Sequence, residues 1–414
     1  MLQNMQQTLC RLYGEKEVLA QQERYAKAVE EFQKLYGNGE YQIYSAPGRT
    51  EVGGNHTDHQ NGKVLAAAVN LDAVAVVLPK AGTEIRLFSE GYGETAVDIS
   101  DLDVKPEEQG TTKALIRGVA CAMKKRGFAI GAFDAYVTSN VLSGSGLSSS
   151  AAFEVLLGNI FSGIYNDGKV DAVTIAQIGK EAENIHFGKP CGLLDQMASS
   201  VGSLVYVDFG DPEKPAVEPV KLDLQAYGYA LCVVDTKGSH ADLTDDYAAI
   251  PQEMRAVAAE FGKTILSELD KEVFYQNISA LREKLGDRPV LRAMHWYAET
   301  QRAEDQKNAL VRKDFTEFLR LVKASGASSY QYLQNVYTSR DIDHQNISIA
   351  LALSDDILQG QGVSRVQGGG FAGTIQAYVP LDFVDTYRTR VEAVFGEGTC
   401  HVLSIRPAGG LRIL

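Results

Sequence analysis

The sequence L-S-G-S-G-L-S-S-S-A-A-F-E, residues 142–154, decides the expected fold. It follows an apolar, β-rich run at residues 133–141 and precedes an apolar segment at residues 151–164 that suits a buried helix. The expected order is therefore strand, loop and helix start. Glycines let a ligand approach the backbone closely, and the free amides and positive dipole end of a helix N-terminus attract anions. We interpret this stretch as a nucleotide phosphate site.

The loop differs from two well-known phosphate-binding patterns. No lysine follows the glycines, as it does in G-x-x-x-x-G-K-[ST], and Ser149 stands where the third glycine of G-x-G-x-x-G would be. A Gly/Ser turn with serines as helix caps would use the same residue types. Taken alone, the loop leaves both interpretations open, so the rest of the chain has to distinguish them.

Length and composition indicate a soluble protein of two lobes. The chain has 414 residues, more than one hydrophobic core usually serves, and its net charge of −13 argues against nucleic acid or an anionic membrane as a partner. Its five cysteines are widely spaced without a zinc-binding pattern, which is typical of free thiols in a reducing compartment. No signal peptide and no membrane-spanning apolar run is evident. We therefore expect a cytoplasmic protein.

A second candidate site follows a short strand expected at residues 41–45. The segment A-P-G-R-T-E-V-G-G-N-H-T-D-H-Q-N-G, residues 46–62, is rich in glycine and polar side chains, and buried strands are expected at residues 63–79. Polar groups on a loop between buried strands are typical of a binding site. A plain surface loop is one alternative. A metal cluster of its His and Asp side chains is another, but no clear set of further ligands accompanies them.

Three acidic residues stand out further along the chain. Residues 170–186 predict a helix with Glu181 and Glu183 near its C-terminal end, where a carboxylate is either solvated or meets a cation. Asp195 lies in the otherwise apolar segment C-G-L-L-D-Q-M, where a carboxylate is usually paired or functional. A helix cap is the alternative for Asp195.

The remaining patterns suggest how the chain is divided. Residues 1–36 predict one or two amphipathic helices, and the second half of the chain is rich in helical spacing. Charges and prolines cluster at residues 211–219, so we expect one unit at residues 1–212 and another at 213–414, with a last strand that can return to the first unit. Three glycines at the end of residues 363–373 predict a tight turn or a close approach to a ligand-binding loop.

In this order, the motifs resemble those of the galactokinase branch of the GHMP small-molecule kinases. A-P-G-R-T-E-V-G-G-N-H-T-D-H-Q-N-G is similar to that branch's A-P-G-R-V-N-L-I-G-E-H-T-D-Y-N-x-G, and G-S-G-L-S-S-S-A-A is similar to its G-L-S-S-S-A-S loop. K-E-A-E-N and P-C-G-L-L-D-Q-M resemble A-E-H and C-G-I-M-D-Q, and Q-G-G-G-F-A-G resembles T-G-G-G-F-G-G. The resemblance implies an α+β, two-lobed GHMP kinase fold with the active site in the cleft between the lobes.

The same resemblance implies an activity and a set of residue roles. The activity is ATP-dependent phosphorylation of a monosaccharide, galactose above all, at its C1 hydroxyl. Arg49 and Asp195 would be the catalytic pair: Asp195 takes or orients the sugar proton, and Arg49 lowers the pKa of Asp195 and stabilises charge on the phosphoryl group. The implied sugar-binding residues are Asn55, His56, Asp58, Gly192 and Tyr247. The implied ATP-binding residues are Gly144, Ser145, Gly146, Leu147, Ser148, Ser149 and Ser150, with Mg²⁺ on Ser150 and Glu183. Ser149 stays open as the alternative metal ligand. The expected partners are the sugar and ATP, for a monomer or weak homodimer.

Asn55 is the departure from the family pattern that bears most on the substrate. The family has Glu there, which meets the C6 hydroxyl of the sugar, whereas Asn is neutral and its amide can donate to a carboxylate. Plant galacturonic acid kinases resemble galactokinases and also have a neutral residue there, followed by D-H-Q. A galacturonic acid kinase is therefore an alternative, and Asn55→Glu is predicted to shift relative kcat/KM toward galactose by at least roughly tenfold.

Two further alternatives follow from the resemblance. A non-catalytic, galactokinase-like sugar sensor needs the sugar and nucleotide but not the base, and the presence of Arg49, Asp195 and Glu183 favours the enzyme. A GHMP kinase acting on mevalonate is disfavoured by the H-T-D loop.

Overall fold

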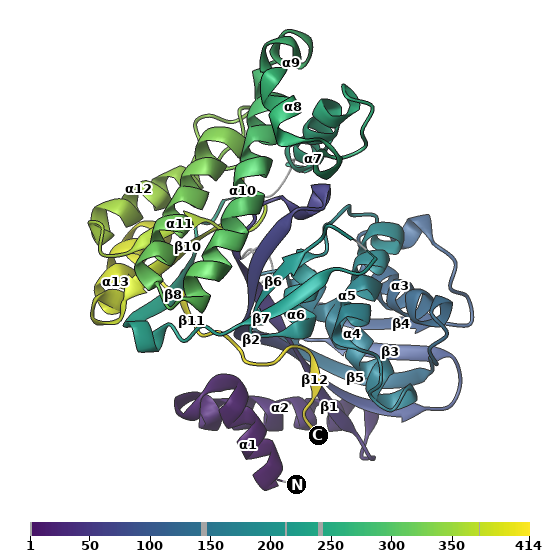
Figure 1. Cartoon of the computed structure of the whole chain (residues 1–414). Coiled ribbons are helices and arrows are strands. Elements are labelled where there is room, and N and C mark those ends of the chain that lie inside the picture. Colours follow the sequence, from purple (N-terminus) through teal and green to yellow (C-terminus); the bar gives the residue numbers. More distant parts are fainter. Residues whose placement is uncertain (1, 142–146, 212, 239–242, 372) are drawn as a thin grey trace.

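The structure is a computed structural model that describes residues 2–141, 147–211, 213–238, 243–371 and 373–414. Two β-sheets, each covered by helices, form two lobes, with the N-terminal lobe at the lower right of Figure 1 and the C-terminal lobe at the upper left. This arrangement confirms the α+β, two-lobed fold class that the sequence motifs predict.

The larger sheet has eight strands in the order β12-β1-β2-β5-β3-β4, with β6 paired to β2 and β7 paired to β6. All neighbouring strands are antiparallel except β3 and β5, which are parallel. The strands are β1 (Gln42–Gly53), β2 (Lys63–Lys80), β3 (Glu84–Ser89), β4 (Gly93–Asp98), β5 (Ala132–Ser139), β6 (Leu204–Asp208), β7 (Ala216–Val220) and β12 (Leu411–Arg412).

Strand β2 organises this sheet because both of its faces are apolar. Ala73, Ala75 and Val77 face the helices on one side of the sheet, whereas Val74 and Val76 face those on the other. This alternation is the period of two that a strand imposes on its side chains. Both faces of the strand are therefore buried, as its near-continuous apolar sequence predicts.

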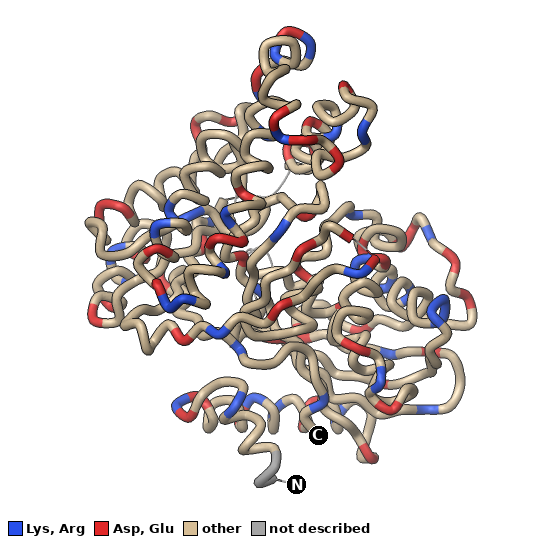
Figure 2. The backbone as a smooth tube through the Cα atoms, in the orientation of Figure 1, with Lys and Arg blue, Asp and Glu red and all other residues tan. Residues whose placement is uncertain are grey.

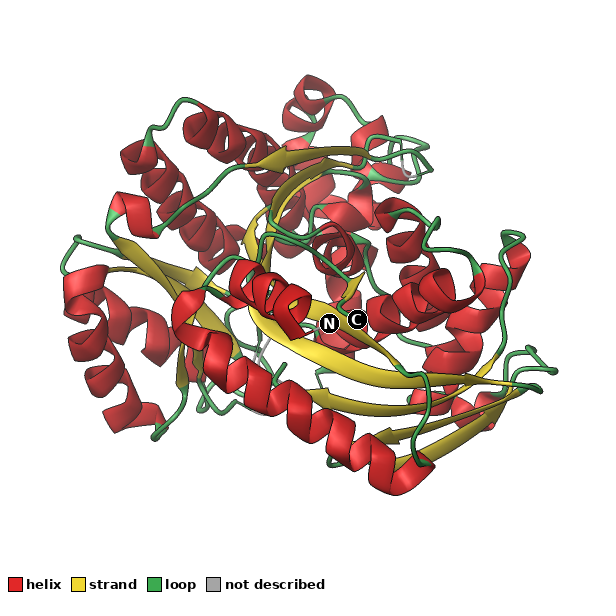
Figure 3. Ribbon diagram, turned by 90° about the horizontal axis from the view of Figure 1, so that it is seen from below, coloured by secondary structure: helices red, strands yellow, loops and turns green. Residues whose placement is uncertain are grey.

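Two groups of helices cover the two faces of the larger sheet. The N-terminal pair, α1 (Leu2–Tyr13) and α2 (Val18–Tyr36), lies across one face, and α2 runs along it in Figure 3. The opposite face carries α3 (Thr112–Lys125), α4 (Ser149–Tyr165), α5 (Ala172–Glu181) and α6 (Leu194–Val201). A π-helical turn, η4 (Ala182–Phe187), extends the end of α5.

The smaller sheet has the order β11-β8-β10-β9 and forms the C-terminal lobe with, among the described residues, seven α-helices. Its strands are β8 (Tyr229–Asp235), β9 (Val363–Val366), β10 (Thr374–Pro380) and β11 (Cys400–Leu403). Its helices are α7 (Thr244–Ala259), α8 (Lys271–Gln276), α9 (Ile278–Leu285), α10 (Asp287–Val311), α11 (Phe315–Ser328), α12 (Asn346–Leu358) and α13 (Val384–Phe395). A π-helical turn, η7 (Ser329–Leu333), follows α11.

A shared apolar core joins the two lobes. Val52 of β1 and Leu65 of β2 pack in one cluster with Leu231 and Val233 of β8 and Phe318 of α11. The C-terminal strand β12 also returns to the first sheet and pairs with β1, so the two chain ends lie near each other in Figures 1 and 3. The lobes are therefore fixed to each other by apolar packing and by a strand crossing.

The strand boundaries differ from the sequence predictions at two places. β1 continues to Gly53, well beyond the expected end at Ser45, because β2 is long enough to pair with it through a bulge between Pro47 and Arg49. The motif arginine therefore lies on a strand and not on a loop. The expected boundary between the two units lies at residues 212 and 213, before β7. In the structure β7 pairs with β6 in the larger sheet, so the chain passes from the larger to the smaller sheet between β7 and β8.

Charged residues of both signs alternate along the outside of both lobes in Figure 2. No helix among the described residues combines the length and apolar character needed to cross a membrane.

Candidate active site

Arg49 and Asp195 lie opposite each other, Arg49 on β1 and Asp195 in the first turn of α6. The guanidinium Nε lies 2.6 Å from Asp195 Oδ1, and Nη2 lies 2.7 Å from Oδ2, so the pair is bidentate. Arg49 is 6% exposed, whereas the Asp195 side chain is 32% exposed. The buried Arg49 therefore fixes the Asp195 carboxylate, and the carboxylate remains accessible to a ligand.

The environment keeps Asp195 ionised. Burial raises its pKa, but the charge and hydrogen bonds of Arg49 and the hydroxyl of Ser148 outweigh burial, so that the pKa lies below its ordinary value. The backbone N–H of Arg49 also donates to the Leu147 oxygen at 3.0 Å, which ties β1 to the residues before α4. At neutral pH the site thus presents a carboxylate that can accept a hydroxyl proton.

Helix α4 begins next to this carboxylate. Ser148 has a left-handed backbone with φ 55° and ψ 67°, and its hydroxyl donates to Asp195 Oδ2 instead of capping the helix. Ser149 and Ser150 occupy the first turn, where backbone N–H groups have no partner inside the helix. The anion-attracting end of α4 therefore faces the Arg49–Asp195 pair. The other predicted phosphate-loop residues, Gly144, Ser145 and Gly146, lie outside the described residues.

Glu183 points inward from the π-helical turn at the end of α5. Its side chain is 3% exposed, and Ser150 Oγ donates to its Oε1 at 3.0 Å. A hydroxyl and a carboxylate side by side are oxygen ligands of the type that Mg²⁺ takes together with substrate phosphates. The pair therefore fits a magnesium ion that is shared with a nucleotide. Within the described part of the chain, no three His, Cys, Asp or Glu side chains converge on a metal position, the His56, Asp58 and His59 group included.

Gln196 and Glu154 support Glu183 from inside the protein. Gln196 Nε2 donates to Glu183 Oε2 and to Glu154 Oε2, each at 2.9 Å. Glu154 is fully buried, and burial together with the charge of Glu183 raises its pKa well above its ordinary value. Glu181, by contrast, pairs with Lys125 and Arg126 at the helix surface. The structure therefore distinguishes the two carboxylates, which their position near the helix end alone leaves equivalent.

The Asn55 side chain is buried and fully engaged by protein groups. It is 1% exposed, and its Nδ2 donates to Glu51 Oε2 at 3.1 Å and to the Gly368 oxygen at 2.8 Å. Its Oδ1 accepts from Ser329 Oγ at 3.1 Å and from Asn335 Nδ2 at 2.9 Å. Both donor hydrogens and both acceptor lone pairs are thus used. In this arrangement the amide has no remaining hydrogen-bonding group for a sugar.

Asp58 and Gly192 connect the first motif to the Asp195 segment. The Asp58 carboxylate accepts from the backbone N–H of Leu194 at 3.4 Å. A Cβ atom on Gly192 would lie 1.7 Å from Asp58 Oδ2, so a side chain at this position would require the Asp58 carboxylate to move. The loop that carries Asp58 therefore packs directly against the turn that presents Asp195.

His56 and Tyr247 both contact the glycine segment between β9 and β10. His56 Nε2 lies 3.1 Å from the Gly369 oxygen, and the Tyr247 hydroxyl donates to the Gly370 oxygen at 2.9 Å. Burial, followed by the proximity of His59, lowers the pKa of His56 to about 3, so His56 is neutral. The fold thus brings the first motif and Tyr247 together at the third motif.

Sequence reasoning assigned no role to several residues at the site. Gln196 and Glu154 lie within the quoted motifs, and Lys189 lies in the G-K-P turn after η4. Glu51 is one of the polar side chains of the first motif, and its carboxylate lies 2.7 Å from Nη2 of the fully buried Arg365. A polar residue inside an apolar segment was the available signal for Gln196 and Glu154. No local pattern marks Lys189 or Arg365, because their partners are supplied by other segments.

Comparison with known proteins identifies two family patterns in the chain. The galactokinase galactose-binding signature matches residues 30–79, and the GHMP kinase N-terminal domain matches residues 114–203. These segments carry the first motif and the serine loop, respectively.

Relatives match along most of the chain. The galactokinase of Streptomyces coelicolor is 30% identical over 394 residues, covering 93% of this chain and 97% of that protein. The galactokinase of Limosilactobacillus reuteri is 26% identical and covers 88% of this chain and 92% of that protein. The solved structure of Lactococcus lactis galactokinase complexed with galactose superimposes with a TM-score of 0.80 at 24% identity, covering 93% of this chain and 99% of that one. The chain therefore belongs to the galactokinase family of GHMP kinases.

Proposed function

We propose that the protein transfers the γ-phosphoryl group of ATP to the C1 hydroxyl of galactose, giving galactose 1-phosphate and ADP. The observation that carries this proposal is the bidentate Arg49–Asp195 pair beside the N-terminus of α4. Family membership supports the sugar and the nucleotide. The galacturonic acid kinase and the non-catalytic sensor are not favoured by the relatives found.

In the proposed reaction, Asp195 and Arg49 have different tasks. Asp195 accepts a hydrogen bond from the C1 hydroxyl and orients its oxygen toward the phosphorus, and it takes the proton as the new bond forms. Its lowered pKa makes it a weak base, so proton transfer follows the movement of charge onto the phosphoryl group. Arg49 keeps Asp195 ionised and stabilises charge on the phosphoryl group. Phosphoryl transfer depends mainly on such positioning and electrostatics.

Ser150 and Glu183 would hold Mg²⁺, with their oxygens 3.0 Å apart. When bound, the ion neutralises charge on the phosphate oxygens. The proposed contribution of the protein is to hold Ser150 and Glu183 side by side. Gln196 donates to Oε2 of Glu183, so that Oε1 faces Ser150. The first turn of α4 supplies backbone N–H groups to the phosphates.

Glu183→Ala should raise the Mg²⁺ concentration needed for half-maximal rate by at least about tenfold, because loss of a supporting group alone typically costs 10–100-fold in metal affinity. Titration of the rate with Mg²⁺ at saturating sugar and ATP measures this. Glu181→Ala is a matched control, since Glu181 is two residues away and pairs with Lys125 and Arg126 instead. Superimposable Mg²⁺ curves for Glu183→Ala and wild type would remove Glu183 from the metal site.

For Asn55 we propose a supporting role and not direct contact with the sugar, because its amide is fully used by Glu51, Gly368, Ser329 and Asn335. Asn55→Ala should lower the free energy of unfolding by about 1–3 kcal/mol, since it leaves buried partners unsatisfied. Urea unfolding measures this loss. The ratio of kcat/KM for galactose to that for galacturonate should stay near wild type. A tenfold shift of this ratio with unchanged stability would instead place the side chain at C6, as the sequence hypothesis has it.

The direct test of the proposed function is ADP release over a panel of monosaccharides that includes galactose, glucose, galacturonate and mannose. We expect galactose to give the highest kcat/KM and the phosphate to be on C1, which phosphorus NMR of the product identifies. A higher kcat/KM for galacturonate would replace the proposed substrate. Sugar binding without ADP release for every sugar would support the sensor instead.

We also propose that the protein acts in the cytoplasm as a monomer or weak homodimer. All five cysteines are free thiols, as is usual in a reducing compartment. Light scattering across a concentration series would reveal a weak dimer as a rising mean mass.

A further inference from the structure

The phosphate loop carries no cation of its own. Residues 142–154 contain neither Lys nor Arg, whereas phosphate loops commonly place a lysine on the β- and γ-phosphates. Arg49 is close by, but both ends of its guanidinium fork contact Asp195. A nucleotide that binds at the N-terminus of α4 would therefore gain from positive charge supplied by another segment of the chain, in addition to the bound Mg²⁺.

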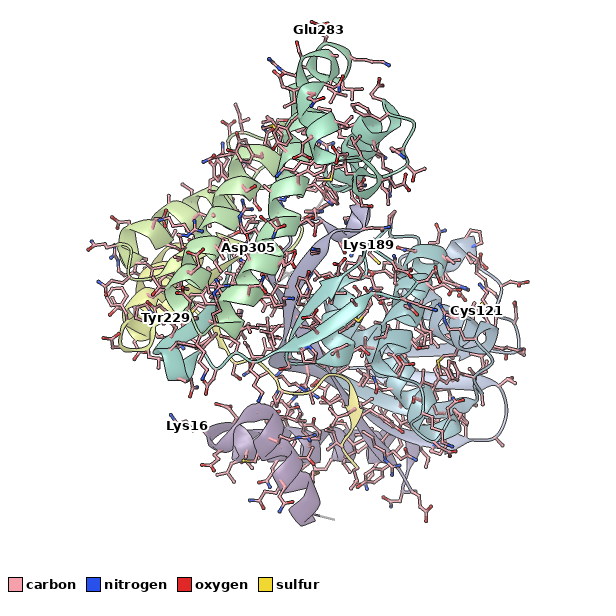
Figure 4. All side chains as sticks on the ribbon, in the orientation of Figure 1. Lys16, Cys121, Lys189, Tyr229, Glu283 and Asp305 are labelled. Atoms are coloured by element: carbon pink, nitrogen blue, oxygen red, sulfur yellow. The ribbon has the colours of Figure 1, made fainter. Side chains whose placement is uncertain are left out.

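Lys189 brings such a charge to the loop. It follows the π-helical turn η4, and its backbone N–H donates to the Glu183 oxygen at 3.1 Å, which anchors the residue. Its Nζ lies 3.4 Å from Glu183 Oε1, the same oxygen that accepts from Ser150 Oγ at 3.0 Å. The Lys189 ammonium and the Ser150 hydroxyl, in the first turn of α4, therefore both contact the same oxygen of Glu183. Figure 4 shows Lys189 at the border between the lobes.

The exposure of the two partners shows which side of the carboxylate Lys189 occupies. Glu183 is 3% exposed, but the Lys189 side chain is 63% exposed. The ammonium therefore lies on the open side of a buried carboxylate, where a ligand of α4 would approach. Its flexible four-carbon stem allows the charge to move to a neighbouring anion while the backbone stays anchored.

The local charge balance favours a second anion as the partner of Lys189. Carboxyl groups are already concentrated near the first turn of α4, on Glu183, Asp195 and the buried Glu154. A triphosphate would add more negative charge there. Arg49 is paired with Asp195, and a bound Mg²⁺ would offset part of the phosphate charge, so Lys189 is placed to offset more of it.

We propose that Lys189 binds the β- and γ-phosphates of the nucleotide and supplies, from the segment between η4 and α6, the cation that the phosphate loop lacks. This inference rests on the proposed function, because it takes the first turn of α4 as the phosphate site. It assigns a substrate-binding residue that neither the loop nor the family motifs mark.

Isothermal titration of ADP and AMP, in the presence of Mg²⁺ and without sugar, tests the proposal. Lys189→Met should weaken ADP binding by about 10–100-fold, the range that loss of a hydrogen bond to a charged group gives. AMP lacks the β-phosphate, so its affinity should stay within about twofold of wild type. Lys189→Arg keeps the charge and should recover most of the ADP affinity.

Lys125→Met is the matched control, because Lys125 also pairs with a glutamate of the α5–η4 segment, at 3.1 Å from Glu181, and is similarly exposed at 56%. It should bind ADP like wild type. Equal weakening of ADP and AMP, or no change in either for Lys189→Met, would overturn the proposal and leave Lys189 as the counterion of Glu183. Thermal unfolding confirms that each variant is folded.

Because no sugar is present, the binding result is independent of which sugar the protein phosphorylates. If galactose fails as a substrate but Lys189→Met selectively loses ADP affinity, the inference stands and only the proposed sugar is wrong. If galactose is phosphorylated and ADP affinity is unchanged, the inference alone is wrong.

Discussion

Replacing Asp195 with alanine should lower kcat by about 10²–10⁴-fold, the usual contribution of a positioned acid–base group. The carboxylate is the group that orients and deprotonates the C1 hydroxyl in the proposed reaction, and it is the only one of the pair that remains partly exposed. ADP affinity should stay close to wild type, because the first turn of α4 and Glu183 are untouched. Steady-state kinetics and ADP titration measure the two quantities.

The Asp195→Asn variant, measured in the same experiment, distinguishes the effect of the carboxylate charge from the effect of the side-chain size. The amide keeps the size of the side chain but accepts a proton poorly, so kcat should fall by a similar factor. In wild type, the lowered pKa of Asp195 means that kcat should decline with acid only below the ordinary Asp pKa of about 3.9, because the ionised form is the active one. A near-normal kcat in Asp195→Ala would exclude Asp195 as the base.

Replacing Asp72 with asparagine should lower the free energy of unfolding by about 3–5 kcal/mol, the usual cost of removing one partner from a buried ion pair. Asp72 is fully buried, and its carboxylate accepts from Arg24 Nη1 at 2.6 Å and from Arg406 Nη1 at 2.7 Å. The hydroxyls of Tyr13 and Ser45 also donate to it. One carboxylate thus joins α1, α2, β1 and the C-terminal segment, and its loss leaves Arg406 buried without a counterion.

Urea unfolding at neutral pH measures this loss. Asp167→Asn is the control, since Asp167 forms an exposed pair with Lys169 and has a positive φ that asparagine tolerates, so it should unfold like wild type. Burial raises the pKa of Asp72, but Arg24 and Arg406 outweigh burial and lower it. The stabilisation is therefore present above the unfolded pKa of about 3.9, and the difference between Asp72→Asn and wild type should shrink below it. If the difference in free energy of unfolding between Asp72→Asn and wild type stayed constant below and above this pH, the charge of Asp72 would not be the cause of the stabilisation.

Much of the local structure could be predicted from the sequence. The helical spacing of residues 1–36 predicts the pair α1 and α2, and the apolar run after position 63 predicts the buried strand β2. Asp171 is a typical N-cap residue type, and at the start of α5 its side chain accepts from the Thr174 N–H. These features depend on residues that are neighbours in the chain, so their period and capping residues are visible in the sequence.

The residues of the candidate site can be separated in the same way, into those that local sequence features predict and those that only the fold brings together. The sequence determined the family, the order of the motifs and the residue types of the site, because glycines, serines and carboxylates at fixed spacing are local features. The family resemblance implied the pairing of Arg49 and Asp195, which are 146 positions apart. Only the tertiary structure showed that Asn55 is enclosed by Gly368, from a segment 313 positions away, and that Lys189 meets the first turn of α4 through Glu183. Such contacts arise from the packing of distant segments, which no local period or motif encodes.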